Sequence, residues 1–138
     1  MDIDKFLSIN YINYNGTLIM ELKINHAIPT QLQWTFAKED LKENLDNISK
    51  TNNKFGFLFD IIKVGMVSLT YIKEFTQIMI DNGDFLEEKL YASAAIADGI
   101  IIKNIFDVVN IFYKTKKPLK IVNNKEDALA FIKSHHIN

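Results

Sequence analysis

The middle of the chain holds a continuous apolar run, residues 55–62, with the sequence Phe-Gly-Phe-Leu-Phe-Asp-Ile-Ile. A strand with one face in water alternates apolar and polar side chains, whereas this run is apolar on both faces except at Asp60. Strands of this kind lie at the centre of parallel sheets that helices cover on both sides. The run therefore predicts a central strand of an α/β fold.

The flanking segments supply the other elements of such a fold. Asn15-Gly16 is a strong signal for a two-residue hairpin turn between two strands, residues 6–13 and 17–24. Hydrophobic periodicity predicts further elements in this order: a helix over 30–49, the strand over 55–62, a helix over 69–81, a strand over 89–97, a helix over 100–114, a strand over 119–122 and a helix capped by Asn124. The order β-β-α-β-α-β-α-β-α indicates a mixed, mostly parallel five-stranded sheet covered by helices. No repeat or linker divides the chain, so we expect a single domain over residues 1–138.

Charge and cysteine content argue against several classes of function. Sixteen Lys residues balance seventeen acidic residues to a net charge of −1, which argues against nucleic-acid binding. The absence of Cys removes thiol catalysis, thiolate metal sites and disulfides, and fits a cytoplasmic protein. The first residues are acidic where a signal peptide needs cations, and the most apolar stretch, residues 100–113, is too short and too polar to span a membrane.

No motif for catalysis, a cofactor or a metal occurs in the sequence. The five Gly residues are isolated, so the chain has neither a phosphate-binding loop nor a dinucleotide fingerprint. His135 and His136 are adjacent and diverge on a helix, and His26 has no neighbouring ligand, so we interpret all three as tail or loop residues. We expect no cofactor and no enzymatic activity. An enzyme of unrecognised class is the third possible function, after the protein-contact module and the ligand carrier described below.

The element order resembles that of the STAS domains (sulphate transporter and anti-sigma-factor antagonist), including the stand-alone bacterial STAS/SEC14-like proteins. The strand Phe57-Leu58-Phe59-Asp60 is similar to the family's central strand, which ends in Asp. Four segments of the C-terminal half carry the more specific likeness: Ala94-Ala95-Ile96, Asn110-Ile111-Phe112, residues 117–121 and residues 126–132. The resemblance covers the whole chain by topology and residues 55–132 by motif, and it implies the STAS-like α/β fold described above.

The resemblance also implies a regulatory position at the start of the helix that follows Asp60. Phospho-regulated members carry Asp-Ser-Ser-Gly there, and the first Ser is phosphorylated. Counting forward from Asp60 places Ser68, Leu69, Thr70 and Tyr71 on these positions, so the acceptor hydroxyl is missing at its usual place. We expect Ser68 to cap the helix, with phosphorylation of Ser68 or Thr70 as the alternative, because a helix N-terminus favours negative charge.

Asp60 is the polar exception in the apolar run. An ionised carboxylate in such a strand is costly without partners. At the carboxyl end of a parallel strand it either faces a ligand-binding crevice or accepts hydrogen bonds from a loop or helix start. We favour the structural role.

The helix predicted over residues 100–113 is apolar on more than one side, although a helix that covers one sheet face needs a single apolar stripe. The excess surface should bury against a neighbouring helix, a second copy of the chain, a partner or an apolar ligand. Among the residues expected on this surface are Ile102, Phe106 and Tyr113, and a symmetric homodimer is our first expectation beyond packing within the domain.

Together these features predict a cytoplasmic, non-catalytic module that regulates or scaffolds through protein–protein contacts. The contacts would use the helix start at Ser68–Tyr71 and the apolar helix, with a partner protein or a second copy. The alternative is a carrier of a small apolar ligand or lipid, of the kind that SEC14-like folds suggest, with its pocket under the same helix.

Overall fold

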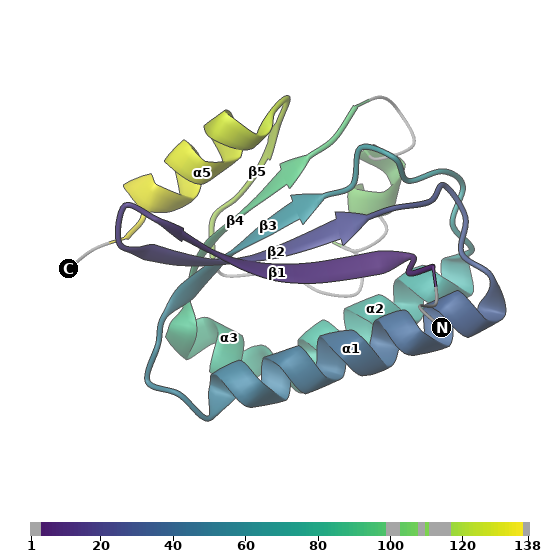
Figure 1. The fold of residues 1–138 in the computed structure, drawn as a ribbon, viewed down its shortest axis with the longest axis horizontal. Helices are drawn as coiled ribbons and strands as arrows, with labels where there is room; N and C mark the ends of the chain where they lie inside the picture. Colours follow the sequence, from purple (N-terminus) through teal and green to yellow (C-terminus); the bar gives the residue numbers. More distant parts are fainter. Residues whose placement is uncertain (1–3, 99–102, 108–109, 111–116, 137–138) are drawn as a thin grey trace.

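The computed structural model describes residues 4–98, 103–107, 110 and 117–136, and these form one five-stranded sheet with helices on both faces (Figure 1). The strands lie in chain order: β1 (Leu7–Tyr14), β2 (Thr17–Ile24), β3 (Phe55–Asp60), β4 (Leu90–Ile96) and β5 (Leu119–Val122). β1 is antiparallel to β2, and each later strand is parallel to the one before it. The predicted mixed, mostly parallel sheet is therefore confirmed.

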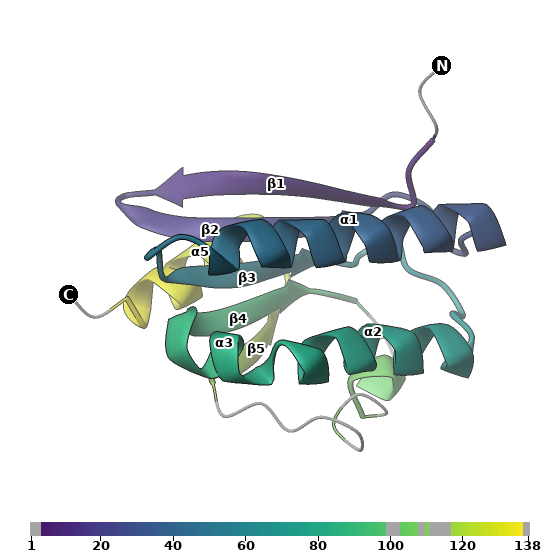
Figure 2. The same ribbon diagram turned by 90° about the horizontal axis from the view of Figure 1, so that it is seen from below.

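The helices divide unequally between the two faces of the sheet. One face carries α1 (Gln31–Ser49), α2 (Leu69–Asp81) and α3 (Gly83–Lys89), and the other carries α5 (Lys125–Ser134) (Figures 1 and 2). Residues 103–107 are also helical. In the described residues, no helix is long and apolar enough to cross a membrane.

The central strand β3 is apolar on both faces because both faces are covered. Phe55 and Phe57 pack toward α1 and α2, with ring centroids 5.1 Å apart, whereas Leu58 packs toward α5. The side chains of a strand alternate between faces, so a single apolar run serves both cores.

The hairpin forms where the sequence predicts it. Asn15 and Gly16 both have positive φ angles, 50° and 88°, and the pair Tyr14–Thr17 closes the turn. Positive φ at both central positions is what a type I′ turn requires, and Asn-Gly adopts it at low cost.

The helix α3 was not predicted, because the sequence indicates no element between the helix over 69–81 and the strand over 89–97. Asn82 does end α2, since its side-chain amide donates to the Ile78 carbonyl at 2.8 Å. A new helix nevertheless begins at Gly83. Its Leu86 is buried and its Phe85 stacks on Phe55 at 5.7 Å, so packing outweighs the weak helix propensity of Gly.

The C-terminal end of α5 is anchored to the hairpin, contrary to the prediction that His136 is a tail residue. His136 Nδ1 lies 2.6 Å from the hydroxyl of Thr17, which is fully buried, and its ring packs on Tyr91 with centroids 4.5 Å apart. Lys133 Nζ also donates to the Asn15 carbonyl at 2.9 Å. Residues more than a hundred positions apart in the chain are thereby joined.

We expect His136→Ala to lower the free energy of unfolding by about 2 kcal/mol, because the buried Thr17 hydroxyl loses its partner. Chemical denaturation of both proteins measures the difference. His135→Ala is the matched control, since the His135 ring meets Phe131 edge-on at 4.8 Å, and it should cost less than about 1 kcal/mol. Equal losses in the two variants would show that the Thr17–His136 contact does not stabilise the fold.

Candidate functional site

A pocket of about 140 Å³ lies between the sheet and the layer of α1 and α2, and we call it the interlayer pocket. Its wall is almost entirely carbon. Strands β1 and β2 contribute Leu7, Leu22 and Ile24, α1 contributes Trp34, Ala37 and Leu41, and α2 contributes Tyr71, Ile72, Phe75 and Ile78. The remaining wall is Phe6, Lys38, Phe59, Ile61, Val64, Val67, Ile105 and Phe106.

Two of the residues singled out from the sequence, Tyr71 and Phe106, meet at this pocket although they come from different helices. Tyr71 stacks on Trp34, with ring centroids 4.9 Å apart, and Phe6 meets Trp34 edge-on at 6.3 Å. The indole N–H of Trp34 is buried and has no hydrogen-bond partner. These three aromatic rings therefore form one part of the pocket wall, which includes the first turn of α2.

A second, smaller pocket of about 60 Å³ lies further along the same layer. Phe59, Phe75 and Phe106 belong to the walls of both pockets, so these three rings separate them. Ser93 and Asn110 bring polar groups to the smaller pocket. Of these two pockets in the described residues, the interlayer pocket has the more apolar wall.

The ammonium group of Lys38, a charged residue of the pocket wall, is paired outside the interlayer pocket. Lys38 of α1 lines the pocket, and its ammonium group forms a half-buried ion pair with Glu74 of α2. A Lys stem packs against apolar surface while its head remains paired, so the pocket receives methylene groups and not a cation.

The connection between β3 and α2 forms part of the pocket, and sequence analysis overlooked it. Ile61, Val64 and Val67 face the pocket, and the Gly65 N–H donates to the Ala27 carbonyl at 2.7 Å, which fixes the loop against the β2–α1 connection. A Cβ at Gly65 would lie 3.1 Å from Ala27 Cβ, so the small residue permits this close approach. The sequence signal that could have predicted this part of the wall is the recurrence of apolar residues in the loop, at Ile61, Val64 and Val67.

Ser68 caps α2 as predicted. Its Oγ accepts a hydrogen bond from the Tyr71 N–H at 3.2 Å, and its backbone is extended as an N-cap requires. Leu69, at the family's acceptor position, and Thr70 are both exposed. Phosphorylation of Ser68 or Thr70 stays a prediction.

Asp60 lies away from the pocket. Phe59 packs toward α2, so the alternation along β3 turns Asp60 to the α5 face, where it neighbours Lys23 of β2. Ligand-binding crevices of open α/β sheets form where the strand order reverses, but the strands of this sheet lie in chain order. The strand order therefore does not support the crevice considered for Asp60, and the role of Asp60 stays a prediction.

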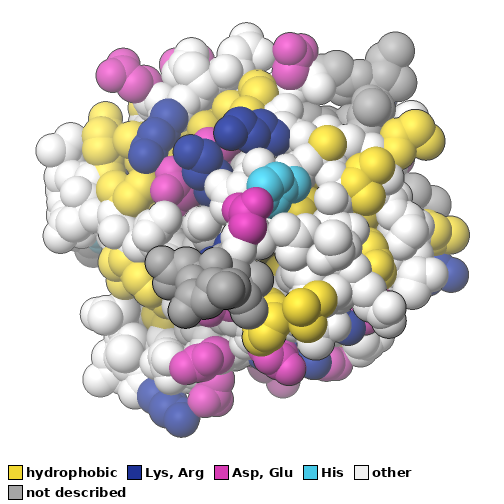
Figure 3. Space-filling view, turned by 45° about the vertical axis from the view of Figure 1, so that its right-hand side comes forward, with side chains coloured by type: hydrophobic (Ala, Val, Ile, Leu, Met, Phe, Trp, Pro, Cys, Tyr) yellow, Lys and Arg dark blue, Asp and Glu magenta, His cyan; other side chains and the backbone are white. Residues whose placement is uncertain are grey.

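The apolar helix is described only in part. Ile102 and Tyr113 lie outside the described residues. Ile105 and Phe106 are half-buried and face the interlayer pocket. On the face of the molecule that Figure 3 shows, exposed apolar side chains are interspersed with polar and charged ones.

The described residues contain no group of His, Asp and Glu side chains arranged to hold a metal ion. The candidate site of the described residues is therefore the apolar pocket. It can hold a molecule by complementary shape and dispersion contacts, and it presents no charged group that would bind an ion.

These features define an α/β protein with the SpoIIAA-like fold, the fold of the STAS domains, which confirms the fold implied by the resemblance. The crystal structure of an uncharacterised protein of the DUF3478 family from Shewanella loihica PV-4, described as SpoIIAA-like, superposes with a TM-score of 0.69. That superposition covers 96% of this chain and 98% of the other, at 18% sequence identity, and it shows the fold alone. No protein-family model and no curated protein matches the sequence.

Proposed function

We propose that this protein is a non-catalytic cytoplasmic binding module whose interlayer pocket holds a small apolar molecule or the apolar end of a larger one. The observation that supports the proposal is the carbon-lined space of about 140 Å³ between α1, α2 and the sheet. It favours the apolar-ligand alternative over self-association through Phe106, because that side chain is half-buried and lines the pocket.

The size of the pocket limits the ligand. Apolar cavities of about 150 Å³ remain dry and admit benzene or xenon. A single aromatic ring or a short branched alkyl group therefore fits the interlayer pocket without movement of its wall. A longer chain would have to displace Phe106, Phe59 or Phe75 to reach the second pocket.

Among the described residues, the wall of the pocket presents very little polar surface. Lys38 is paired with Glu74, and the ring of Tyr71 is stacked on Trp34. General acid–base catalysis needs a titratable group within hydrogen-bond reach of the reacting atom, whereas this wall presents carbon. Binding alone is the activity that we assign to it.

The regulatory role expected from the sequence is compatible with this binding. Tyr71 belongs both to the pocket wall and to the first turn of α2, where Ser68 forms the cap. A ligand that displaces Tyr71 from Trp34 would alter the surface at Ser68–Tyr71, which is the segment proposed to contact a partner protein.

Fluorescence titration with toluene tests the proposal, because Trp34 is the only Trp of the chain and lines the pocket. We expect a saturable change in Trp34 emission with a Kd of about 1 mM, as a ligand of this size can supply. Protonated benzylamine, which has a similar ring and a charge, should produce no saturable change, because the pocket cannot solvate an ammonium group. Equal responses to both compounds, or no response to toluene, would contradict the proposal.

A further inference from the structure

The outer edge of β1 is free to pair with another strand. Figure 2 shows β1 along the border of the sheet, with no helix or strand of the described residues beyond it. The pair Tyr14–Thr17 closes a two-residue hairpin, so Tyr14 and every second residue before it bond to β2. The N–H and C=O groups of the intervening residues point outward: Leu7, Ile9, Tyr11 and Asn13.

Natural edge strands usually carry features that prevent pairing, and β1 lacks them. Its sequence, Leu-Ser-Ile-Asn-Tyr-Ile-Asn-Tyr, has no Pro and no charged residue, and its register with β2 runs without a bulge. Lys, Pro and bulges are the common devices that block such an edge. The strand is therefore a ready acceptor for an added strand.

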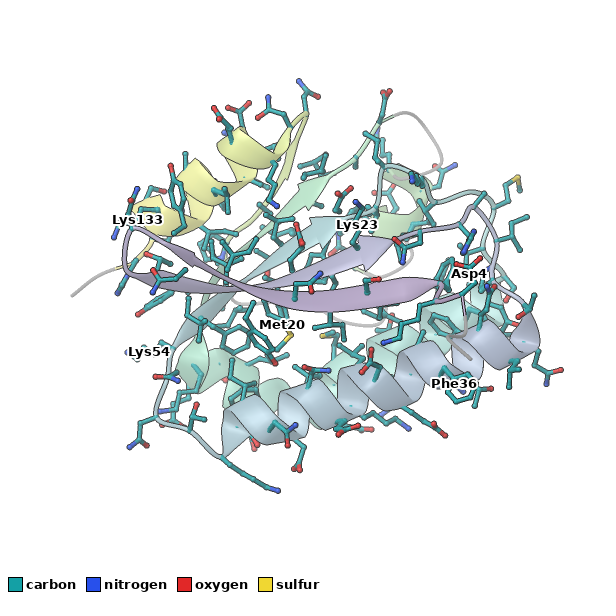
Figure 4. All side chains as sticks on the ribbon, viewed as in Figure 1. Asp4, Met20, Lys23, Phe36, Lys54 and Lys133 are labelled. Carbon is teal, nitrogen blue, oxygen red and sulfur yellow. The ribbon has the colours of Figure 1, made fainter. Side chains whose placement is uncertain are left out.

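A groove of about 420 Å³ lies at the start of this edge, between residues 4–7 and α1. Figure 4 labels Asp4 at the start of β1 and Phe36 on α1, at the same end of the molecule. Phe36 is 41% exposed and supplies an apolar contact. Among the described residues that line the groove, the charged ones are mostly acidic: Asp4, Glu39, Asp40 and Glu43, with Lys5 as the one cation.

Tyr11 connects the edge with the acidic side of the groove. Its hydroxyl donates to Asn44 Oδ1 at 2.9 Å, and the Asn44 amide lies 3.3 Å from Asp40 Oδ1. Burial and the negative charge of Asp40 raise the pKa of Tyr11. The negative charge of Asp40 is thus felt by Tyr11, in the middle of β1.

We propose that β1 and this groove bind an extended, basic segment of a partner protein by β-strand addition. Main-chain hydrogen bonds to the outward groups of β1 would provide affinity, while alternate Lys or Arg side chains would meet the acidic groove. A second copy of this chain fits less well, because antiparallel pairing centred on Tyr11 brings Asp40 close to Asp40 of the copy, and like charges repel. This inference does not depend on the apolar ligand proposed above.

The test uses a synthetic octapeptide of alternating Val and Lys, added to the full chain and followed by NMR. We expect amide hydrogen exchange to slow at Leu7, Ile9, Tyr11 and Asn13, whose N–H groups point away from β2. Exchange at Ser8, Asn10 and Ile12 should barely change, because β2 already protects them. A peptide with the same side chains and N-methyl groups at alternate residues should bind at least tenfold more weakly, since it cannot complete the ladder.

Charge variants in α1 test the groove and leave the sequence of the strand unchanged. Asp40→Asn combined with Glu43→Gln should weaken binding of the Val-Lys peptide about tenfold. Asp46→Asn, on α1 but outside the groove, is the matched control and should change affinity less than twofold.

Each other outcome overturns the proposal. An alternating Val-Glu peptide that binds equally well would refute basic recognition, and unchanged exchange at Ile9 and Tyr11 would refute strand addition. Slowed exchange at these residues in the protein alone, together with a dimer in sedimentation, would identify a second copy as the occupant.

Discussion

Replacing Gly56 with Ala is expected to lower the melting temperature by about 10 °C, corresponding to a loss of about 3 kcal/mol in the free energy of unfolding. Gly56 lies in β3 on the face covered by α5. A Cβ at this position would lie 2.2 Å from Ile132 Cγ2 and 3.2 Å from the Ala92 carbonyl oxygen. Ile132 is fully buried, so the methyl group can be accommodated only if α5 moves away from the sheet.

A double-mutant cycle separates this clash from a loss of strand flexibility. Ile132→Leu moves the branch point of the side chain away from Gly56 and should cost less than about 1.5 kcal/mol alone. In the Gly56→Ala background the same change should recover about half of the lost stability. Additive losses would show that the contact with Ile132 is not the cause.

Gly83→Ala is the matched control for this prediction. No atom lies within 4 Å of a Cβ built at Gly83, and the residue begins α3. We expect unchanged or slightly higher stability, because Ala restricts the unfolded chain more than Gly does. Melting curves of both Gly→Ala variants make the comparison directly.

Filling the interlayer pocket is expected to abolish toluene binding while leaving the fold intact. Leu22 of β2 and Ile78 of α2 are both buried and belong to its wall. Leu22→Phe combined with Ile78→Phe replaces two aliphatic side chains with larger rings that occupy the space of the ligand. We expect the affinity for toluene, measured by Trp34 fluorescence, to fall at least tenfold.

The stability of the filled variant should stay within about 1 kcal/mol of the native protein, because new contacts offset the strain of the larger rings. Leu32→Phe combined with Ile80→Phe is the matched control, since both residues are exposed and neither lines the pocket. The control should bind toluene normally. Normal binding by the filled variant would place the ligand elsewhere.

Local signals predicted most of the fold. The run around Phe57 is apolar on both faces because a core lies on each side of β3, and Asn15-Gly16 has the backbone that its sequence favours. The caps Ser68 and Asn124 also lie where their side chains indicated. These features depend on neighbours in the chain, which a sequence displays directly.

The site was only partly predictable, because it depends on which faces of the helices and the sheet pack against one another. Tyr71 was selected by a family pattern and Phe106 by excess hydrophobicity, and neither signal placed them at one pocket. Trp34 fits the ordinary spacing of α1, so nothing in the sequence marks its contact with Tyr71. His136 likewise gave no sign of its contact with Thr17, which lies at the far end of the chain.

The central claim is that the space between α1, α2 and the sheet binds an apolar molecule. Nuclear Overhauser effects between toluene and assigned methyl groups test it most directly, because they locate the ligand within a few ångströms. We predict contacts with the methyl groups of Leu22, Ile24 and Ile78, which line the interlayer pocket. Contacts confined to the exposed side chains of Met66 and Leu69, or to Ile19 and Ile132 in the core beneath α5, would contradict the account.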